Sequence, residues 1–401
     1  MFGLTSIVAW VLSHWASKLI SFVPVIHSAP ASLQGSVAVY RVLSGLGLFH
    51  ALHAVGLIGL SSPDDPRASF HTSLWWVKVP LLLVLVFGMF FIPDSALTAL
   101  SYIGLVLAAV FIVLQLILLV GVTYDWAGAW IDNLHNAPDG QTGWYKALLA
   151  ATFALYAVAI GLAATSFQFF AKSSSHSTPG GCGTNTAFIT INMIIWIVTS
   201  ALSVLPAVQA GNERSGLLQS AAVAAYSSYL VLSALLSLSP DASCAYAPAA
   251  EGTGTSSSTP IHLTSLIAGA AFTVISVGYS ATKLSLKDDD LRLDADPAAA
   301  PILASSDPEM GSTNAGGDDS GGTTLVYSVS WFHASFMLAA AYVAMLLTNW
   351  AILSHGANGD SLKVNSGNAA VWVQMSSSWL VHLLYFWTLV APIILTNRDF
   401  S

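Results

Sequence analysis

The sequence predicts an all-α integral membrane protein with about ten transmembrane helices. Of its 401 residues, 55% are hydrophobic and only 8% are charged, and the mean hydropathy is +0.70. A soluble domain carries about 25% charged residues, so exposed apolar segments would cover the surface of this chain in water. Apolar runs of about 20 residues, the length that crosses a bilayer of about 30 Å, recur along the whole sequence. We therefore expect a multi-pass protein of the plasma membrane or an endomembrane.

The apolar runs divide the chain into one transmembrane domain, 1–401, with ten predicted helices. These are expected near 2–24, 37–60, 71–93, 97–133, 143–171, 187–206, 215–238, 263–283, 326–350 and 369–396. The first is the weakest, because its serines, His14 and Lys18 form a polar stripe that also suits an interfacial helix. No basic run precedes its apolar stretch, so we expect a retained helix and not a cleaved signal.

The fourth segment, 97–133, differs from the others in length. Pro93 and Asp94 end the third helix, and helical patterning then continues for about 37 residues or about 55 Å. An upright helix of that length would project far beyond the bilayer. We therefore expect it to be strongly tilted and to cross the molecule diagonally.

The basic residues predict a cytoplasmic N-terminus. That orientation places seven Lys and Arg residues on the cytoplasmic side, against Lys172 and Lys363 outside. The seven are Arg67, Lys146, Arg214, Lys283, Lys287, Arg292 and Arg398. The 284–324 loop carries nine of the 20 acidic residues and is rich in Ser, Gly and Pro, so it is expected to be a disordered cytoplasmic loop that is free to bind partners.

Several function classes have no support in the sequence. The basic residues are few and scattered, so nucleic acid is not an expected partner. Phosphate-binding glycine loops, zinc-protease motifs and nucleophile elbows are all absent. We therefore predict that the protein is not an enzyme, and we assign it no cofactor and no metal.

The two cysteines, Cys182 and Cys244, follow the fifth and seventh predicted helices. The predicted topology places both in non-cytoplasmic loops, where thiols can oxidise. A disulfide between them is the expected state, and two independent buried thiols are the alternative.

Ionisable and polar side chains inside the predicted helices are the candidate functional residues, because each is costly in hydrocarbon unless it is paired or wetted. Lys78 lies deep enough in the third helix to need a partner, although it also fits an interfacial anchor beside Trp75 and Trp76. His50 and His53 share one helix face, and like His333 and His382 they fit buried or hydrogen-bonded histidines better than metal ligands.

The remaining candidates are neutral amides and one carboxylate. Gln115 and Asn192, together with Gln219, Gln374 and several serines, can form hydrogen bonds between helices or can wet a path for a polar headgroup. Asp125 lies near the cytoplasmic end of the long helix and also fits a wetted helix end. The lipid-pathway candidates are thus Lys78, Asp125, Gln115, Asn192 and His333.

Several motifs resemble the serine incorporator (SERINC/TMS) family of polytopic membrane proteins. They occur in the family's order and include Arg214-Ser-Gly-Leu-Leu-Gln-Ser220, Tyr385-Phe-Trp-Thr-Leu-Val-Ala-Pro392, Leu395-Thr-Asn-Arg-Asp-Phe400, Val39-Tyr-Arg41, Trp76-Val-Lys78 and Phe91-Ile-Pro-Asp94. Two features depart from the family pattern. Residues 1–36 contain no cysteine, and Gly121 and Tyr124 stand where the family typically has an Asp and a His. Lys78 therefore lacks the usual carboxylate partner unless Asp125, one turn later, substitutes for it.

The resemblance implies two helical bundles joined by the long tilted fourth helix, and a role in membrane lipids. The leading hypothesis is ATP-independent scrambling of phosphatidylserine and similar phospholipids, with membrane phospholipids as partners. One alternative is a serine carrier or scaffold that supports serine incorporation into phosphatidylserine and sphingolipids. Another is a receptor or interaction protein that uses the acidic loop.

Overall fold

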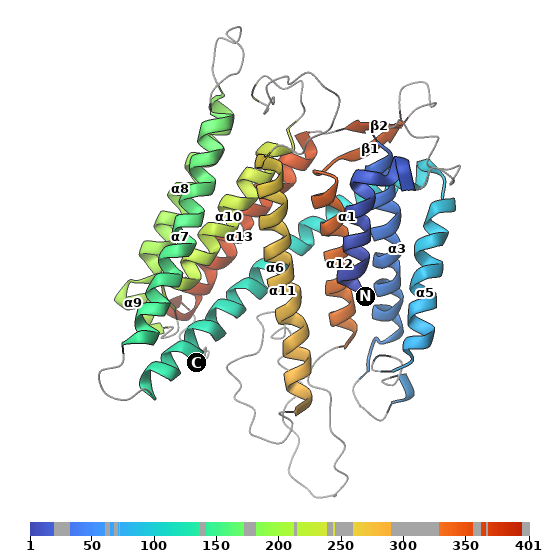
Figure 1. The fold of residues 1–401 in the computed structure, drawn as a ribbon. Coiled ribbons are helices and arrows are strands. Elements are labelled where there is room, and N and C mark those ends of the chain that lie inside the picture. The colour runs from blue at the N-terminus through green and yellow to red at the C-terminus, as the bar shows by residue number, and fades with distance from the viewer. Residues whose placement is uncertain are drawn as a thin grey trace, which may run out of the picture.

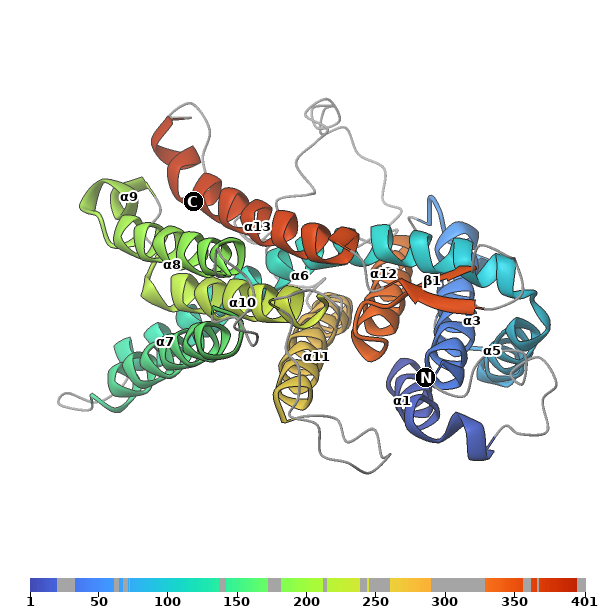
Figure 2. The same ribbon diagram turned by 90° about the horizontal axis from the view of Figure 1, so that it is seen from above.

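The computed structural model contains the predicted series of ten apolar helices. It describes residues 1–19, 33–60, 65–67, 71, 73–136, 142–171, 182–211, 215–238, 244, 260–289, 329–355, 362–365 and 368–394. Among these, eight helices are long and apolar enough to cross a membrane, and two shorter apolar helices, Phe2–Ala16 and Trp75–Phe91, match the first and third predicted segments. The helices form two bundles joined by a long diagonal helix (Figures 1 and 2), as the family resemblance implied.

The N-terminal bundle is built around one buried helix, α3. It consists of α1 (Phe2–Leu19), α3 (Gln34–Gly56), α5 (Trp75–Gly88) with the short 3-10 turn η1 (Met89–Phe91), and α12 (Val329–Leu347). Helix α3 packs against α1, α5 and α12. It can occupy the centre because apolar side chains such as Val39, Leu43 and Leu46 are buried on it.

The C-terminal bundle is built around α10 (Leu217–Leu236) in the same way. It also contains α7 (Gly143–Phe170), α8 (Gly183–Ser203), the short α9 (Pro206–Gly211), which was not predicted, and α13 (Asn368–Ile394). Helix α10 packs against α7, α8, α13 and α6. In its apolar 18-residue stretch, 94% of the residues are buried. Small residues at Ala221, Ala222 and Ala224 allow these neighbours to approach closely.

Two helices lie between the bundles. Helix α6 (Asp94–His135) has 42 residues, about 63 Å at 1.5 Å per residue, and runs diagonally from the N-terminal to the C-terminal bundle (Figure 1). It contacts α3 and α12 on one side and α7, α10 and α13 on the other. Helix α11 (Pro260–Asp289) contacts α6, α10 and α12. The predicted acidic loop therefore begins later than expected, because 284–289 is helical; 290–324 lies outside the described residues.

A two-stranded antiparallel hairpin is a local departure from the predicted all-α class. Strands β1 (Ile352–His355) and β2 (Leu362–Asn365) pair with Ile352 opposite Asn365. Helix α12 ends at Leu347 and not at 350, because Asn349 and Trp350 have left-handed backbone angles, with φ of 51° and 58°. The hairpin is held on the helices by Leu353 N, which donates to Ser101 Oγ over 3.2 Å.

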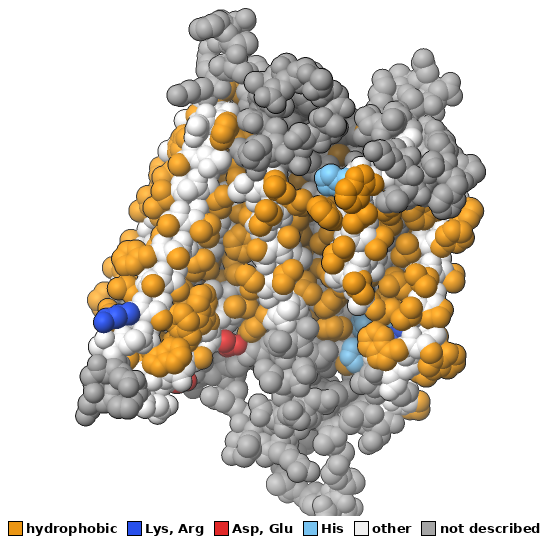
Figure 3. Space-filling view, in the orientation of Figure 1, with side chains coloured by type: hydrophobic (Ala, Val, Ile, Leu, Met, Phe, Trp, Pro, Cys, Tyr) orange, Lys and Arg blue, Asp and Glu red, His pale blue; other side chains and the backbone are white. Residues whose placement is uncertain are grey.

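The outer surface of the helices is apolar. Hydrophobic side chains cover the face seen in Figure 3, and the basic, acidic and histidine side chains that the view shows lie toward its upper and lower margins. On α5, for example, Leu83, Val84 and Phe87 are each more than 60% exposed. Such a surface is stable in lipid and not in water, so the protein is an integral, multi-pass membrane protein.

Candidate functional site

A stripe of polar side chains runs along α10 between the two bundles. Tyr226, Tyr229, Ser233 and Ser237 recur at three- and four-residue spacing, so they share one face of the helix. We call these four residues the inter-bundle stripe. The distance from Tyr226 to Ser237 is about 17 Å along the helix axis, which is more than half of the hydrocarbon thickness.

Three of the four residues of the stripe are bonded to different helices. Tyr226 Oη donates to Gln115 Oε1 and to the Ile112 carbonyl of α6, each over 3.0 Å. Tyr229 Oη lies 2.8 Å from Tyr342 Oη of α12. At the end of α10, Gln374 Nε2 of α13 donates to Ser237 Oγ over 3.2 Å. The stripe therefore connects the central helix of one bundle to α6 and to the other bundle through neutral hydrogen bonds.

Helix α11 covers this stripe. The ring of Phe272 packs 5.2 Å from that of Tyr226 and 5.6 Å from that of Tyr229. Gly269 permits this approach, because a Cβ atom there would collide with the Tyr229 hydroxyl and lie 2.8 Å from Leu346 Cδ1. Further along α11, Tyr279 Oη donates to Asp125 Oδ2 of α6 over 2.8 Å. Asp125 thus extends the polar contacts of α6 and α11 beyond Gln115.

Asn192 lies in a separate polar cluster within the C-terminal bundle. Its Oδ1 accepts from Ser378 Oγ over 3.3 Å and from His382 Nε2 over 3.1 Å, both on α13. Its Nδ2 donates to Ser228 Oγ, on the other side of α10 from the stripe, over 3.4 Å. Asn192 therefore joins α8, α10 and α13 and is 2% exposed.

Lys78 and His333 lie together in the N-terminal bundle, away from the stripe. Lys78 Nζ donates to the backbone carbonyl of His71 and lies 4.7 Å from the centroid of the Trp75 ring. Its side chain is buried although it carries a charge, which is tolerated because the carbonyl and the ring face both offer negative potential. His333 Nδ1 lies 3.1 Å from His50 Nδ1, and His333 Nε2 lies 3.1 Å from His71 Nδ1.

The position of the family's usual carboxylate does not face Lys78. Gly121 of α6 faces α11, where a Cβ atom would lie 3.1 Å from Tyr279 Oη. Asp125, the predicted substitute one turn later, is likewise bonded to Tyr279. Lys78 donates its hydrogen bond to the backbone carbonyl of His71 instead. A backbone acceptor cannot be predicted from side-chain motifs.

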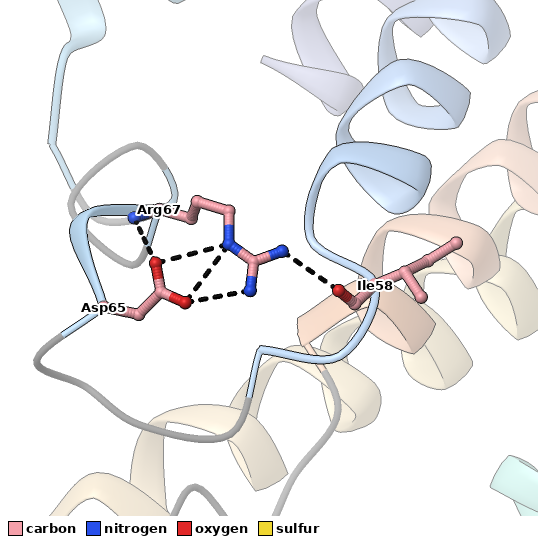
Figure 4. Close-up of polar contacts among 3 residues, drawn as sticks. All are labelled: Ile58, Asp65 and Arg67. Carbon is pink, nitrogen blue, oxygen red and sulfur yellow. Dashed lines mark hydrogen bonds and ion pairs between the residues drawn. The ribbon is translucent and has the colours of Figure 1, made fainter.

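Asp65 and Arg67, which lie between α3 and α5 and shortly before His71 in the sequence, form an ion pair. Asp65 accepts from the backbone N and from Nη2 of Arg67, each over 2.8 Å, and Arg67 Nη1 donates to the Ile58 carbonyl over 3.1 Å (Figure 4). The hydrogen bond from the Arg67 guanidinium holds the pKa of the Asp65 carboxyl below its usual value. Both side chains are solvent-accessible, so the pair is not a candidate site.

An ion pair between the fully buried Arg41 and the partly exposed Asp94 escaped the sequence analysis. Arg41 is fully buried and donates to Asp94 Oδ1 over 3.0 Å and to the carbonyls of Met89 and Ile92 over 2.6 and 2.9 Å. The sequence places Arg41 near the start of the second predicted helix, 37–60, but does not reveal its partner. The available signal was Asp94, an acidic residue that follows Pro93 before the long predicted helix.

The predicted disulfide is confirmed. Cys182 precedes α8, Cys244 follows α10, and the two are bonded with a Cα–Cα distance of 5.7 Å and a sequence separation of 62 residues. Asn185 Nδ2 donates to the Cys244 carbonyl over 3.2 Å. The bond therefore ties the start of α8 to the end of α10 at one end of the C-terminal bundle.

Comparison with known proteins identifies the family. A family model described as serine incorporator (Serinc) matches residues 1–398. Serine incorporator 3 of Bos taurus is 35% identical over 398 residues, covering 91% of this chain and 80% of the relative. A probable serine incorporator of Dictyostelium discoideum is 33% identical over 408 residues, covering 99% and 92%; one of Monosiga brevicollis is 33% identical over 399 residues, covering 92% and 79%. The chain therefore belongs to the serine incorporator family.

Proposed function

We propose that this chain is an ATP-independent phospholipid scramblase that acts on phosphatidylserine and similar lipids. The observation that carries the proposal is the inter-bundle stripe, because it places polar groups at successive depths in an otherwise apolar membrane domain. A headgroup that crosses a bilayer must exchange its water for other hydrogen-bonding groups, since each unsatisfied polar group costs several kcal/mol in hydrocarbon. The movement makes and breaks no covalent bond, so no enzyme chemistry is required.

The path that we propose lies where α6, α10 and α11 meet. From one side of the membrane to the other it passes the Ser237–Gln374 contact, the Tyr229–Tyr342 and Tyr226–Gln115 contacts, and finally the Tyr279–Asp125 contact. In this structure α11 covers the middle of the path through Phe272 and Gly269. Displacement of α11 from α10 is therefore the step that would admit a headgroup.

The experiment uses the purified full-length chain in liposomes that contain fluorescent phosphatidylserine, with dithionite added outside to bleach the exposed leaflet. An active protein lets nearly all of the lipid be bleached, whereas protein-free liposomes protect about half of it. Gln115→Leu removes an amide of the path while keeping its bulk and should slow bleaching severalfold. Ser228→Ala, on the opposite face of α10, is the matched control and should leave the rate unchanged. Equal rates in the parent and in Gln115→Leu would reject this path.

A second variant tests the role of α11. Gly269→Ala adds a methyl group where the Tyr229 hydroxyl and Leu346 already lie, so α11 must move away from α10. Faster bleaching in this variant supports α11 as the covering element. A slower rate would mean that close packing of α11 is itself needed for passage.

Lys78 remains a proposed contact for lipid phosphate. Its Nζ already has the His71 carbonyl and the Trp75 ring, so it contributes to passage only if it exchanges these partners for a phosphate. Lys78→Met keeps the apolar stem and removes the charge. Slower bleaching at normal expression supports the lipid role, whereas parental bleaching assigns the lysine to anchoring α5.

The name of the relatives points to serine as an alternative cargo. Uptake of radiolabelled serine by the same liposomes distinguishes the two functions. Serine accumulation without lipid bleaching would replace the scramblase proposal with a serine carrier.

A further inference from the structure

Three histidines from different parts of the chain form a linear hydrogen-bonded series in the N-terminal bundle. His50 lies on α3, His333 on α12, and His71 precedes α5. His333 lies in the middle, with Nδ1 3.1 Å from His50 Nδ1 and Nε2 3.1 Å from His71 Nδ1. We call these three residues the histidine chain. It is separate from the inter-bundle stripe, and the proposed lipid path makes no use of it.

The geometry of the histidine chain suits proton transfer and not metal binding. A shared metal ion requires lone pairs that converge on one point, whereas His333 directs its two ring nitrogens at two different histidines. Within the described part of the chain, no group of three or more His, Cys, Asp or Glu side chains has an arrangement suited to a metal ion. Two consecutive ring-to-ring hydrogen bonds instead form an uninterrupted route from His71 to His50.

The hydrogen-bonding capacity of imidazole gives the chain two alternative polarities. A neutral imidazole has one N–H donor and one lone-pair acceptor, so His333 donates to one neighbour and accepts from the other. In one polarity His71 donates to His333 and His333 donates to His50; in the other, both bonds are reversed. The two polarities differ by the passage of one proton along the chain.

We propose that the histidine chain is a proton-binding relay that delivers a proton from His71 to the buried His50. In the first polarity the lone pair of His71 Nε2 takes a proton from hydronium. The Nδ1–H bond of His71 then breaks as an N–H bond forms at His333 Nε2, and the Nδ1–H bond of His333 breaks as one forms at His50 Nδ1. One proton is taken up, none is lost, and the chain is left in the second polarity with His50 as an imidazolium.

The two ends of the chain fit these roles. His71 is partly exposed and can exchange protons with solvent, whereas His50 and His333 are each 6% exposed. His50 Nε2 is buried and has no hydrogen-bond partner among the described residues. The rings of Phe49 and Phe336 lie 5.2 Å from that of His50, and that of Phe2 lies 6.4 Å away. Aromatic rings at this distance can stabilise a cation.

Cationic groups lie near both ends of the histidine chain. The ammonium of Lys78 acts on His53, His71 and His333. His53, whose Nδ1 donates to the Phe49 carbonyl over 2.8 Å, and the amino group of Met1 act on His50. Lys78 therefore opposes a proton at His71 and His333, while the Met1 amino group and His53 oppose one at His50, so an excess proton stays on the chain only transiently and its passage is what the test measures.

The test measures how quickly the ring N–H protons of His50 exchange with water. The full chain carries 11 histidines; it is labelled with ¹⁵N-histidine, placed in lipid nanodiscs and studied by NMR with saturation of the water signal. His50→Gln assigns the resonance. His333→Gln keeps a donor and an acceptor between the neighbours but cannot relay a proton, so His50 exchange should slow at least tenfold. His382→Gln, a buried histidine of the other bundle, is the matched control and should leave the exchange rate unchanged.

A second variant keeps the relay testable if His333→Gln fails to fold. His71→Gln removes the outer imidazole, which lies outside the long helices, and should slow His50 exchange as strongly. Parental exchange at His50 in either folded variant would overturn the relay, because the proton would then reach His50 by another route.

Discussion

The two bundles of this protein bury different kinds of polar group. The N-terminal bundle buries cations and titratable rings, namely Arg41, Lys78, His50 and His333. The C-terminal bundle, by contrast, buries mostly hydroxyls, phenols and amides along α10 and α13. Buried charges need fixed partners, because an unpaired ion costs several kcal/mol, whereas neutral groups can exchange partners at a lower cost. The comparison indicates that the polar contacts of the C-terminal side can rearrange more easily than those of the N-terminal side, as the proposed lipid path requires.

The bundles also differ in what holds them together. The disulfide ties α8 to α10 in the C-terminal bundle, and the ion pair of Arg41 and Asp94 ties α3 to α6 in the N-terminal bundle. A disulfide stabilises the fold because it lowers the conformational entropy of the unfolded chain. The ion pair, by contrast, stabilises only the folded state, in which both partners meet. Four predictions test this comparison.

The largest expected effect is loss of the disulfide. Replacing Cys182 and Cys244 together by Ala reopens a loop with a separation of 62 residues. The chain-entropy model gives a loss of about 4 kcal/mol in unfolding free energy. Thermal unfolding of the purified protein, followed by tryptophan fluorescence, measures it, and the parent treated with reductant should shift in the same way. An unchanged unfolding temperature would show that the disulfide does not stabilise the C-terminal bundle.

The next largest effect is expected at Arg41. Arg41→Met keeps most of the side-chain volume but removes the hydrogen bonds that Arg41 donates to Asp94 and to the carbonyls of Met89 and Ile92. Removing one partner of a buried ion pair costs about 3 kcal/mol. Arg67→Met, at the exposed pair with Asp65, is the matched control and should scarcely change the unfolding temperature. Similar shifts in both variants would mean that burial does not distinguish the two ion pairs.

A smaller effect is expected at the Tyr229–Tyr342 contact. Hydrogen bonds between membrane helices contribute about 0.6 kcal/mol in double-mutant cycles. The cycle of Tyr229→Phe, Tyr342→Phe and the double variant should therefore give a coupling of about that size. A coupling above about 2 kcal/mol would show that the bundles are joined too tightly for the stripe to open readily.

The smallest effect is expected at Asp65. Its hydrogen bonds from Arg67 hold its pKa below the value in the unfolded chain. Above the unfolded pKa of about 3.9 the pair contributes its full stabilisation, which is lost as the pH falls through the lower, folded pKa. Unfolding curves of the parent and of Asp65→Asn should therefore nearly coincide at neutral pH. A large difference there would indicate that the Ile58–Arg67 segment supports the N-terminal bundle.

The sequence by itself determined the membrane class, the ten apolar helices and the long tilted α6, because hydropathy and length are local properties of each segment. It also determined the disulfide, since alternating spans place Cys182 and Cys244 on the same side. It did not reveal the hairpin, whose strands of four residues are too short to give a periodic signal. The orientation across the membrane remains a prediction.

Only the tertiary structure decided which polar groups meet. His50 and His333 are 283 residues apart in sequence, and Tyr229 and Tyr342 are 113 apart. Gln115 accepts a hydrogen bond from Tyr226 of the stripe, whereas Asn192, an equally plausible amide, lies in a separate cluster with side chains of α13. In a membrane domain every helix is apolar, so the pattern of one helix does not reveal its neighbours. Small residues such as Gly269 allow two helix faces to pack closely, and this packing decides which polar side chains meet. Close packing depends on both helices of a pair, so neither sequence segment reveals it alone.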